Sequence, residues 1–149
     1  MEEFKKNAMK RAAANDPIAL QQVGSDRYRE GDYESGIKYL TKAAELGDAE
    51  AHHTLMSLYG KGQVVEKDEK KEWYHLEEAA IAGHPLARYK LGCREVLNER
   101  PERAVKHWII AANLGCDKST RMLKQFYSSG LVSKEEFAAA LRAHQAAVD

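Results

Sequence analysis

The sequence of 149 residues has little of what builds sheets. Val, Ile and Thr together occur 15 times, against 22 alanines. Since β-branched residues favour strands and alanine is the strongest helix former, this composition excludes a sheet protein. With only 10 glycines and 3 prolines to interrupt helices, we expect helix almost throughout.

The chain also lacks the marks of secreted and membrane proteins. Its two cysteines, Cys93 and Cys116, are too few and too far apart for a disulfide framework. No segment approaches the roughly 18 consecutive apolar residues of a transmembrane helix. Residues 1–16 lack the apolar centre of a secretory signal. We therefore expect reduced thiols in a protein of the cytoplasm, or of the nucleus, that makes no contact with a membrane.

An excess of charge of one sign is missing as well. Lys and Arg number 23 and Asp and Glu number 23, so the formal net charge is zero. Dedicated nucleic-acid binders carry a strong basic excess, so no nucleic acid is expected as a partner. The 44% of apolar residues excludes a solvated, acidic, disordered chain.

What the chain does have is an internal repeat. Residues 39–55, 75–91 and 107–123 superimpose without a gap, and each contains Ala-Ala, two further residues and then glycine. Asn15 stands where the first such glycine would be, so the spacings between these turn residues are 32, 36 and 32. A period in the thirties that tolerates a four-residue insertion is typical of paired helices joined by one variable loop.

Capping residues give the ends of the helices. Asp16 before Pro17 and Asp48 before Ala49 are N-caps, and Ser133 with Glu136 forms a capping box. The turn residues Asn15, Gly47, Gly83 and Gly115 suit the left-handed conformation that follows a helix end. The pattern predicts nine helices, near residues 3–14, 16–30, 33–46, 48–60, 68–82, 85–97, 101–114, 117–129 and 134–147.

The repeat units resemble the Sel1-like repeats. That family's pattern reads here as Ala51, Leu55-Met56, Tyr59, Gly62, Asp68, Ala79-Ala80 and Gly83. The third unit has Glu95 and Asn98 where Tyr and Gly are usual, and the first unit is equally similar to a tetratricopeptide repeat. The resemblance implies an all-α fold, an α/α superhelical solenoid of about four helix pairs after an N-terminal cap helix, and a role as a scaffold for protein contacts.

On this basis we expect a single repeat domain over residues 1–149. The cap helix at residues 1–14 would pack through a stripe of Phe4, Ala8 and Ala12. The partition of the chain is 1–14 for the cap, 15–46 for repeat 1, 47–82 for repeat 2, 83–114 for repeat 3, and 115–149 for repeat 4 with a C-terminal cap helix. An array cut from a longer protein is the alternative.

No motif for catalysis or for a cofactor is found. His52 and His53 are adjacent and point about 100° apart on a helix, so they cannot both face one ion. His75 and His107 share a column with Tyr39, which a stacked repeat explains without a metal. Since nucleophile, phosphate and dinucleotide motifs are lacking, we expect no enzyme, no metal and no cofactor. A catalytic Cys93 or Cys116 is a weak rival interpretation.

The remaining candidate is a surface along the first helices of the pairs, which line the concave face in this class of fold. Glu50, Leu86 and Lys118 lie at the rim of this surface. Together with these residues the surface has a net charge of +3, although the chain as a whole is neutral. We expect Tyr89 to be its one exposed aromatic side chain. The candidate partner-binding residues are Gln21, Ser25, Arg29, His53, Ser57, Lys61, Tyr89, Cys93, Leu97, Arg121 and Gln125.

We therefore predict a non-enzymatic adaptor that binds a protein or peptide segment, acidic or bearing a carboxylate, in its concave groove. The alternative is a structural subunit that docks into a larger complex through its outer helices. The sequence leaves the oligomeric state open.

Overall fold

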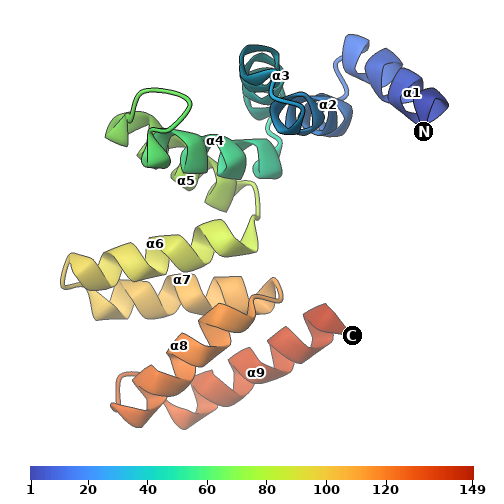
Figure 1. Cartoon of the computed structure of the whole chain (residues 1–149). Coiled ribbons are helices and arrows are strands. Elements are labelled where there is room, and N and C mark those ends of the chain that lie inside the picture. The colour runs from blue at the N-terminus through green and yellow to red at the C-terminus, as the bar shows by residue number, and fades with distance from the viewer. The chain divides into compact units, whose positions relative to one another are not determined.

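The computed structural model describes all of residues 1–149, and every regular element in it is a helix (Figure 1). Each end of the nine helices lies within one residue of the sequence prediction, so the all-α expectation is confirmed. No helix is both long enough and apolar enough to cross a membrane. The helices are α1 (Glu2–Ala13), α2 (Pro17–Arg29), α3 (Tyr33–Glu45), α4 (Ala49–Lys61), α5 (Glu69–Ile81), α6 (Pro85–Leu97), α7 (Pro101–Asn113), α8 (Asp117–Ser128) and α9 (Lys134–Val148).

The predicted N-caps are confirmed. The Asp16 carboxylate accepts hydrogen bonds from the first backbone amides of α2, and the Asp48 carboxylate accepts one from the amide of Ala51 at 2.8 Å. At the start of α9, Ser133 and Glu136 bond each other's backbone amides in the expected capping box. These caps satisfy amides that the helix itself leaves without acceptors.

The predicted turn residues are confirmed too. Gly47, Gly83 and Gly115 have φ between 90° and 93°, and Asn15 has φ of 61°. The turn between α6 and α7 is formed by Glu99 at φ of 58°, a conformation that a non-glycine residue rarely adopts and that the sequence did not indicate.

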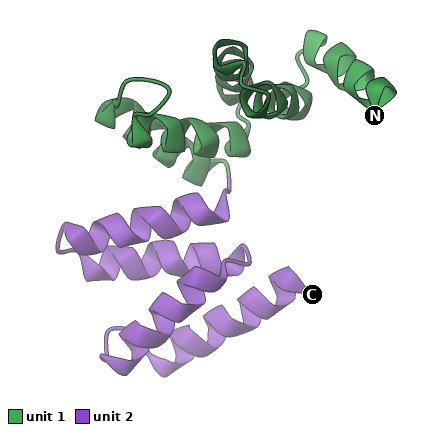
Figure 2. Ribbon diagram, in the orientation of Figure 1, with its two compact units in different colours: residues 1–82 green, residues 83–149 purple.

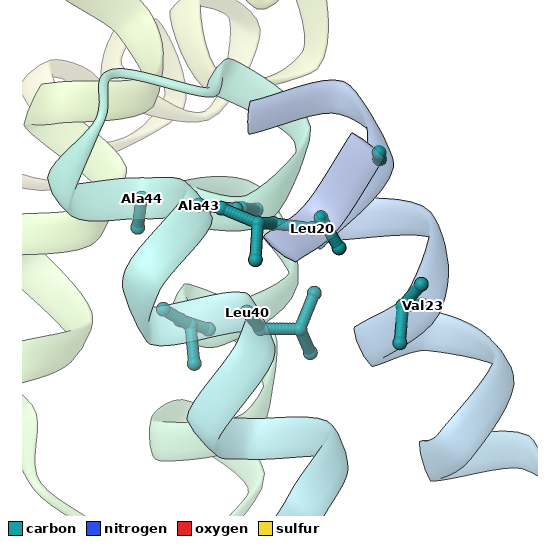
Figure 3. Packing of buried hydrophobic residues seen from close by; sticks show 9 residues of the cluster. Leu20, Val23, Leu40, Ala43 and Ala44 are labelled. Atoms are coloured by element: carbon teal, nitrogen blue, oxygen red, sulfur yellow. The ribbon is translucent and has the colours of Figure 1, made fainter. Parts of the chain in front are cut away.

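The chain folds as two compact units, residues 1–82 with α1 to α5 and residues 83–149 with α6 to α9 (Figure 2). In the first unit, α2 packs against α3 and α4 against α5. Leu20 and Val23 from α2 meet Leu40, Ala43 and Ala44 from α3 in a core whose side chains are at most 5% exposed (Figure 3).

Two glycines set how closely α2 and α3 approach. A Cβ on Gly24 would lie 2.9 Å from the carbonyl oxygen of Gly36, and a Cβ on Gly36 would lie 2.9 Å from that of Gly24. Any side chain at either position would push the two helices apart, since real Cβ atoms do not approach backbone so closely.

The core of the second unit is built around Trp108 of α7, which is fully buried. The ring of Phe126 from α8 meets the Trp108 indole edge-on, with ring centroids 4.8 Å apart. Val132 and Ala140 close this core from the segment that leads into α9 and from α9 itself. These contacts bury a large apolar area between α7, α8 and α9.

The first helix differs in one respect from the expectation. Ala12 is buried and Ala8 packs against the core, but Phe4 is 60% exposed, so the prediction of a packed stripe was wrong at Phe4. The Lys5 ammonium instead ties α1 to α2 through an ion pair with Glu30 at 3.1 Å.

Candidate functional site

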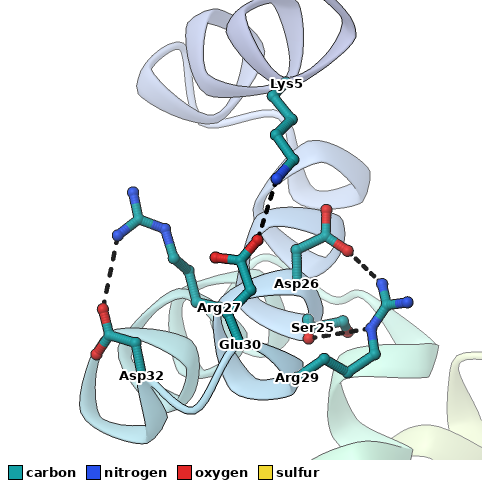
Figure 4. Close-up of polar contacts among 7 residues, drawn as sticks. All are labelled: Lys5, Ser25, Asp26, Arg27, Arg29, Glu30 and Asp32. Atoms are coloured by element: carbon teal, nitrogen blue, oxygen red, sulfur yellow. Dashed lines mark hydrogen bonds and ion pairs between the residues drawn. The ribbon is translucent and has the colours of Figure 1, made fainter. Parts of the chain in front are cut away.

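The first group of candidate binding residues lies on α2 and is held by internal polar contacts. The Gln21 side-chain amide donates to the Ser25 hydroxyl at 3.0 Å. Arg29 is exposed, but its guanidinium is ion-paired with Asp26 on the same helix (Figure 4). Because Asp26 neutralises Arg29, the α2 part of the surface does not carry the free positive charge that counting residues assigns to it.

The end of α2 repeats this balance of charges. Glu30 is paired with Lys5, and Arg27 lies 3.6 Å from Asp32 at the start of α3 (Figure 4). Opposite charges alternate over this part of the unit, so it has no field of one sign to attract a charged partner.

On α4, His53 and Ser57 are half-buried, and Lys61 is exposed at the last position of the helix. These three residues complete the candidate set of the first unit.

The second group lies on α6 and α8 of the second unit, and here the structure brings the candidate residues together. The Cys93 thiol lies one turn along α6 from Tyr89, and its interaction with the Tyr89 hydroxyl, together with burial, raises the pKa of Tyr89. The Lys118 ammonium of α8 lies 5.8 Å from the centre of the Tyr89 ring, within the range of a cation–π contact. Arg121 is close enough to act on the same hydroxyl in the opposite direction.

Tyr89 itself differs from the expectation. It is half-buried and packs against the Trp108 core, so it is not the fully exposed aromatic residue that the sequence suggested. Lys118 and Arg121 are exposed beside it, and Leu97, at the end of α6, is 83% exposed. Gln125 follows Arg121 by one turn and is exposed as well.

The positive charges beside Tyr89 are not neutralised. Asp117, the acidic residue nearest to Lys118 along the chain, is bonded at 2.6 Å to the His144 ring of α9. Neither Lys118 nor Arg121 has an acidic partner in the structure. The surface formed by Tyr89, Lys118 and Arg121, called the α6–α8 surface below, therefore combines an aromatic ring with two available cations.

The two cysteines differ in burial. Cys93 is half-buried beneath Tyr89, and Cys116 is buried at the position that precedes α8. Both are free thiols.

Sequence reasoning missed a buried histidine pair in the first unit. His52 of α4 and His75 of α5 are 4% and 9% exposed, and their Nδ1 atoms are 2.9 Å apart. The centres of the two rings are 5.2 Å apart. This separation is close to the nitrogen–nitrogen distance plus the radius of each ring, which requires both nitrogens to lie on the line between the ring centres. The two nitrogens therefore face each other head-on. This alignment suits one shared proton; a tetrahedral metal ion would need the two lone pairs to meet at an angle.

Burial disfavours a positive charge on both rings. It lowers the pKa of His52, and burial together with His52 and Lys71 lowers the pKa of His75 to about 4. The pair forms one wall of a pocket of about 260 Å³ between α3, α4 and α5. The pocket is lined by Thr41, Ala44, Glu45, His52, Tyr59, Lys71, Tyr74 and His75.

A signal for this pair was present in the repeat. His52 lies 32 residues after Leu20 and 36 before Arg88, and His75 lies in the column of Tyr39 and His107. The third member of this series is also in contact, since Arg88 Nη1 lies 3.4 Å from His107 Nδ1. Aligning the column that contains His52 with the column that contains His75 would have indicated that the side chains of the two columns face each other.

Comparison with known proteins supports the architecture described above. The sequence model of the Sel1 repeat matches residues 17–48, 54–84 and 85–116. These matches cover more than half of the chain, and the protein therefore belongs to the Sel1 repeat family.

Two solved structures are similar to it. A Sel1 repeat protein from Oxalobacter formigenes superimposes with a TM-score of 0.78 at 26% identity, over 96% of this chain and 63% of that one. The c5321 protein, a protective antigen of uropathogenic Escherichia coli strains displaying an SLR fold, gives a TM-score of 0.69 at 23% identity, over 85% of this chain and 29% of that one. The chain thus spans less than two thirds of either neighbour. No curated protein matches its sequence.

Proposed function

We propose that this protein is a non-enzymatic adaptor that binds an acidic segment of a partner protein through the α6–α8 surface. The observation that carries the proposal is the Lys118 ammonium lying over the Tyr89 ring, with Arg121 beside it. Sel1 repeats typically mediate contacts between proteins, and this surface is where the candidate residues offer both apolar area and available charge.

The chemistry of the surface selects the partner. Two cations without acidic partners attract carboxylates, and an arginine fork binds a carboxylate through two parallel hydrogen bonds. A half-buried tyrosine offers a rigid ring against which an apolar side chain of the same segment packs. An acidic side chain or the carboxylate at the C-terminus of a peptide meets both demands.

Selection from a displayed library of random peptides tests the proposal. The immobilised protein is exposed to the library at low ionic strength, beside its Arg121→Glu variant. We expect the wild type to enrich peptides rich in Asp and Glu, and the variant to lose this enrichment. Recovery of neutral or basic peptides, or equal recovery by the variant, would contradict the proposed function.

A second candidate function is a structural subunit that docks through its outer helices. It is favoured by Ile110 on α7 and Leu114, the residue that follows α7, which are 40% and 42% exposed. Sedimentation of the wild type and of an Ile110→Lys variant separates the two functions. Self-association that the substitution abolishes would favour docking through α7, and a monomer in both cases would favour the adaptor.

We also propose that the protein acts in the cytoplasm or the nucleus. The two free thiols support this, because reducing compartments keep cysteines unpaired. Fractionation of the source cells with a tagged copy of the chain tests the location, and recovery from an oxidising compartment would contradict it.

A further inference from the structure

The protons of the His52–His75 pair can be assigned from its hydrogen bonds. The backbone carbonyl of Ala44 favours a proton on the His52 ring, whose Nδ1 faces His75. Because Nδ1 is directed at His75, we place the proton of His52 on Nε2. The Nδ1 of His52 is therefore the acceptor, and the Nδ1–H of His75 is the donor, since a neutral imidazole carries one proton. A single proton lies between the two rings.

This assignment leaves the outer nitrogen of His75 without a proton. The Nε2 of His75 carries a lone pair, and the ring is stacked on Tyr59 at a centroid distance of 5.8 Å with an angle of 3° between the planes. The Tyr74 ring meets it edge-on at 5.1 Å. The pair is thus enclosed by rings that do not stabilise a positive charge as water would.

Charged groups face the pair from three helices. Glu45 of α3 lines the same pocket, and Asp48 at the start of α4 and Glu78 of α5 favour a charge on His52. Lys71 of α5 acts in the opposite direction on His75, as does His52 itself. Burial is the largest influence on both rings, so the acidic groups do not restore the charge that removal from water disfavours.

We propose that the His52–His75 contact is a proton-sensitive latch, which holds α4 and α5 together while both rings are neutral and releases them when the pair takes up protons. If both rings were charged, two N–H groups would face each other at the 2.9 Å that now separates the nitrogens. These two facing N–H groups would then have no acceptor. The open arrangement, in which water reaches both rings, becomes the favoured one.

The direction of the pH dependence follows from linkage. In the open state each imidazole titrates near its ordinary value of about 6.5, whereas His75 in the closed state has a pKa of about 4. Opening therefore takes up protons at pH values between these two. The latch is fully closed above pH 6.5 and loosens as the pH falls toward 4.

The first helix pair of the chain has residues without an imidazole at the same two positions. Leu20 and Tyr39 occupy the equivalent positions on α2 and α3, where Leu20 is 1% exposed and Tyr39 packs against the core. The double variant His52→Leu/His75→Tyr copies this pair into α4 and α5. It removes the titrating groups and keeps an apolar contact that the fold already uses.

Amide hydrogen exchange, corrected for intrinsic rates, tests the latch on the full chain. In the wild type we expect protection of α4 and α5 to fall on the order of tenfold from pH 7 to pH 5, relative to α2 and α3. In the double variant we expect no more than about a twofold change. A His107→Gln control, altered in the other unit, should behave as the wild type does. Equal pH dependence in wild type and double variant would overturn the proposal.

A second measurement needs no variant. The ring resonances of the six histidines can be followed by NMR as the pH is lowered. We expect the His75 ring to stay neutral well below pH 6.5, until the exchange of α4 and α5 amides accelerates. Titration of both His52 and His75 near pH 6.5 with unchanged amide protection would refute the latch, whether or not the double variant folds.

Discussion

The indole ring of Trp108 lies directly against the backbone of Gly92. A Cβ added to Gly92 would be 2.6 Å from Trp108 Cδ1, closer than side-chain atoms pack in proteins. The indole is fixed there by its Nε1–H, which donates to the carbonyl of Tyr89 at 3.2 Å, and by the edge of Phe126. A glycine in the middle of α6 is therefore the condition for burying the largest side chain of the second unit.

Replacing Gly92 with alanine should destabilise the protein by about 1–3 kcal/mol, because the indole and its hydrogen bond must shift. In an open helix the same change would stabilise by about 1 kcal/mol. Gly60→Ala on α4 is the matched control, since the nearest atoms that the added Cβ would meet are those of the Glu72 carboxylate, at the end of a flexible side chain. Urea unfolding measures both. Equal effects of the two substitutions would contradict the packing described for Trp108.

Gly83→Val should lower the free energy of unfolding by on the order of 1–3 kcal/mol through backbone strain alone. Gly83 has φ of 93°, and an added Cβ would have no atom within 4 Å apart from those of the adjacent residues, so the cost comes from the backbone conformation. Gly83→Asn should lose less than about 1 kcal/mol, as Asn tolerates this conformation and Asn15 adopts it at the equivalent turn. Equal melting temperatures of the two variants would show that backbone strain does not cause the loss of stability.

Two extra residues, Gly-Ser, inserted between Gln63 and Val64 should leave the melting temperature nearly unchanged. Both flanking side chains are exposed, and the entropy of loop closure grows slowly with length. The ends of this loop stay fixed, because the Asp68 amide donates to the Tyr59 carbonyl at 3.1 Å. A large drop in melting temperature would mean that residues 63–67 are packed in a way that their exposure does not indicate.

Arg88→Leu should raise the pKa of His107 and leave it below 6.5. Burial is the main cause of the lowered value and stays in place, whereas the guanidinium beside the ring, the second cause, is removed. Since folded His107 resists a proton that the unfolded chain accepts, its contribution to stability is present above pH 6.5 and is lost as the pH falls. NMR titration of the ring checks the shift, with Lys106→Gln as control. An unchanged or lower pKa would contradict the role of Arg88.

Local chemistry made the helices and their ends predictable. A cap such as Asp48 acts on amides two or three residues away, and a turn residue such as Gly115 acts on the helix just before it. The positions of the helix ends can therefore be predicted from residues that lie close together in the sequence. The partition of the chain into four repeats stays a prediction.

Contacts between helices were not predictable in the same way. The pairing of His52 with His75 depends on how α4 and α5 face each other, and the burial of Tyr89 depends on the side chains of α7 and α8. The pairing of Asp26 with Arg29 is of another kind, because the two residues lie three apart on the same helix, a spacing that a count of charges ignores. The sequence therefore predicted which positions form the candidate site. It did not predict the exposure of their side chains or the free charge of the surface, because both depend on packing.

The most direct test of the proposed function is a titration of one acidic peptide from the library selection, labelled with a fluorophore, against four proteins at low and high salt. These are the wild type, Arg121→Glu, Tyr89→Ala, and the control Lys106→Glu on the exposed side of α7. We expect Arg121→Glu to weaken binding about tenfold or more at low salt, Tyr89→Ala to weaken it further, and the control to match the wild type. High salt should weaken binding of the peptide by the wild type and have less effect on its binding by Arg121→Glu. Four indistinguishable affinities, in proteins of equal stability, would contradict binding at the α6–α8 surface.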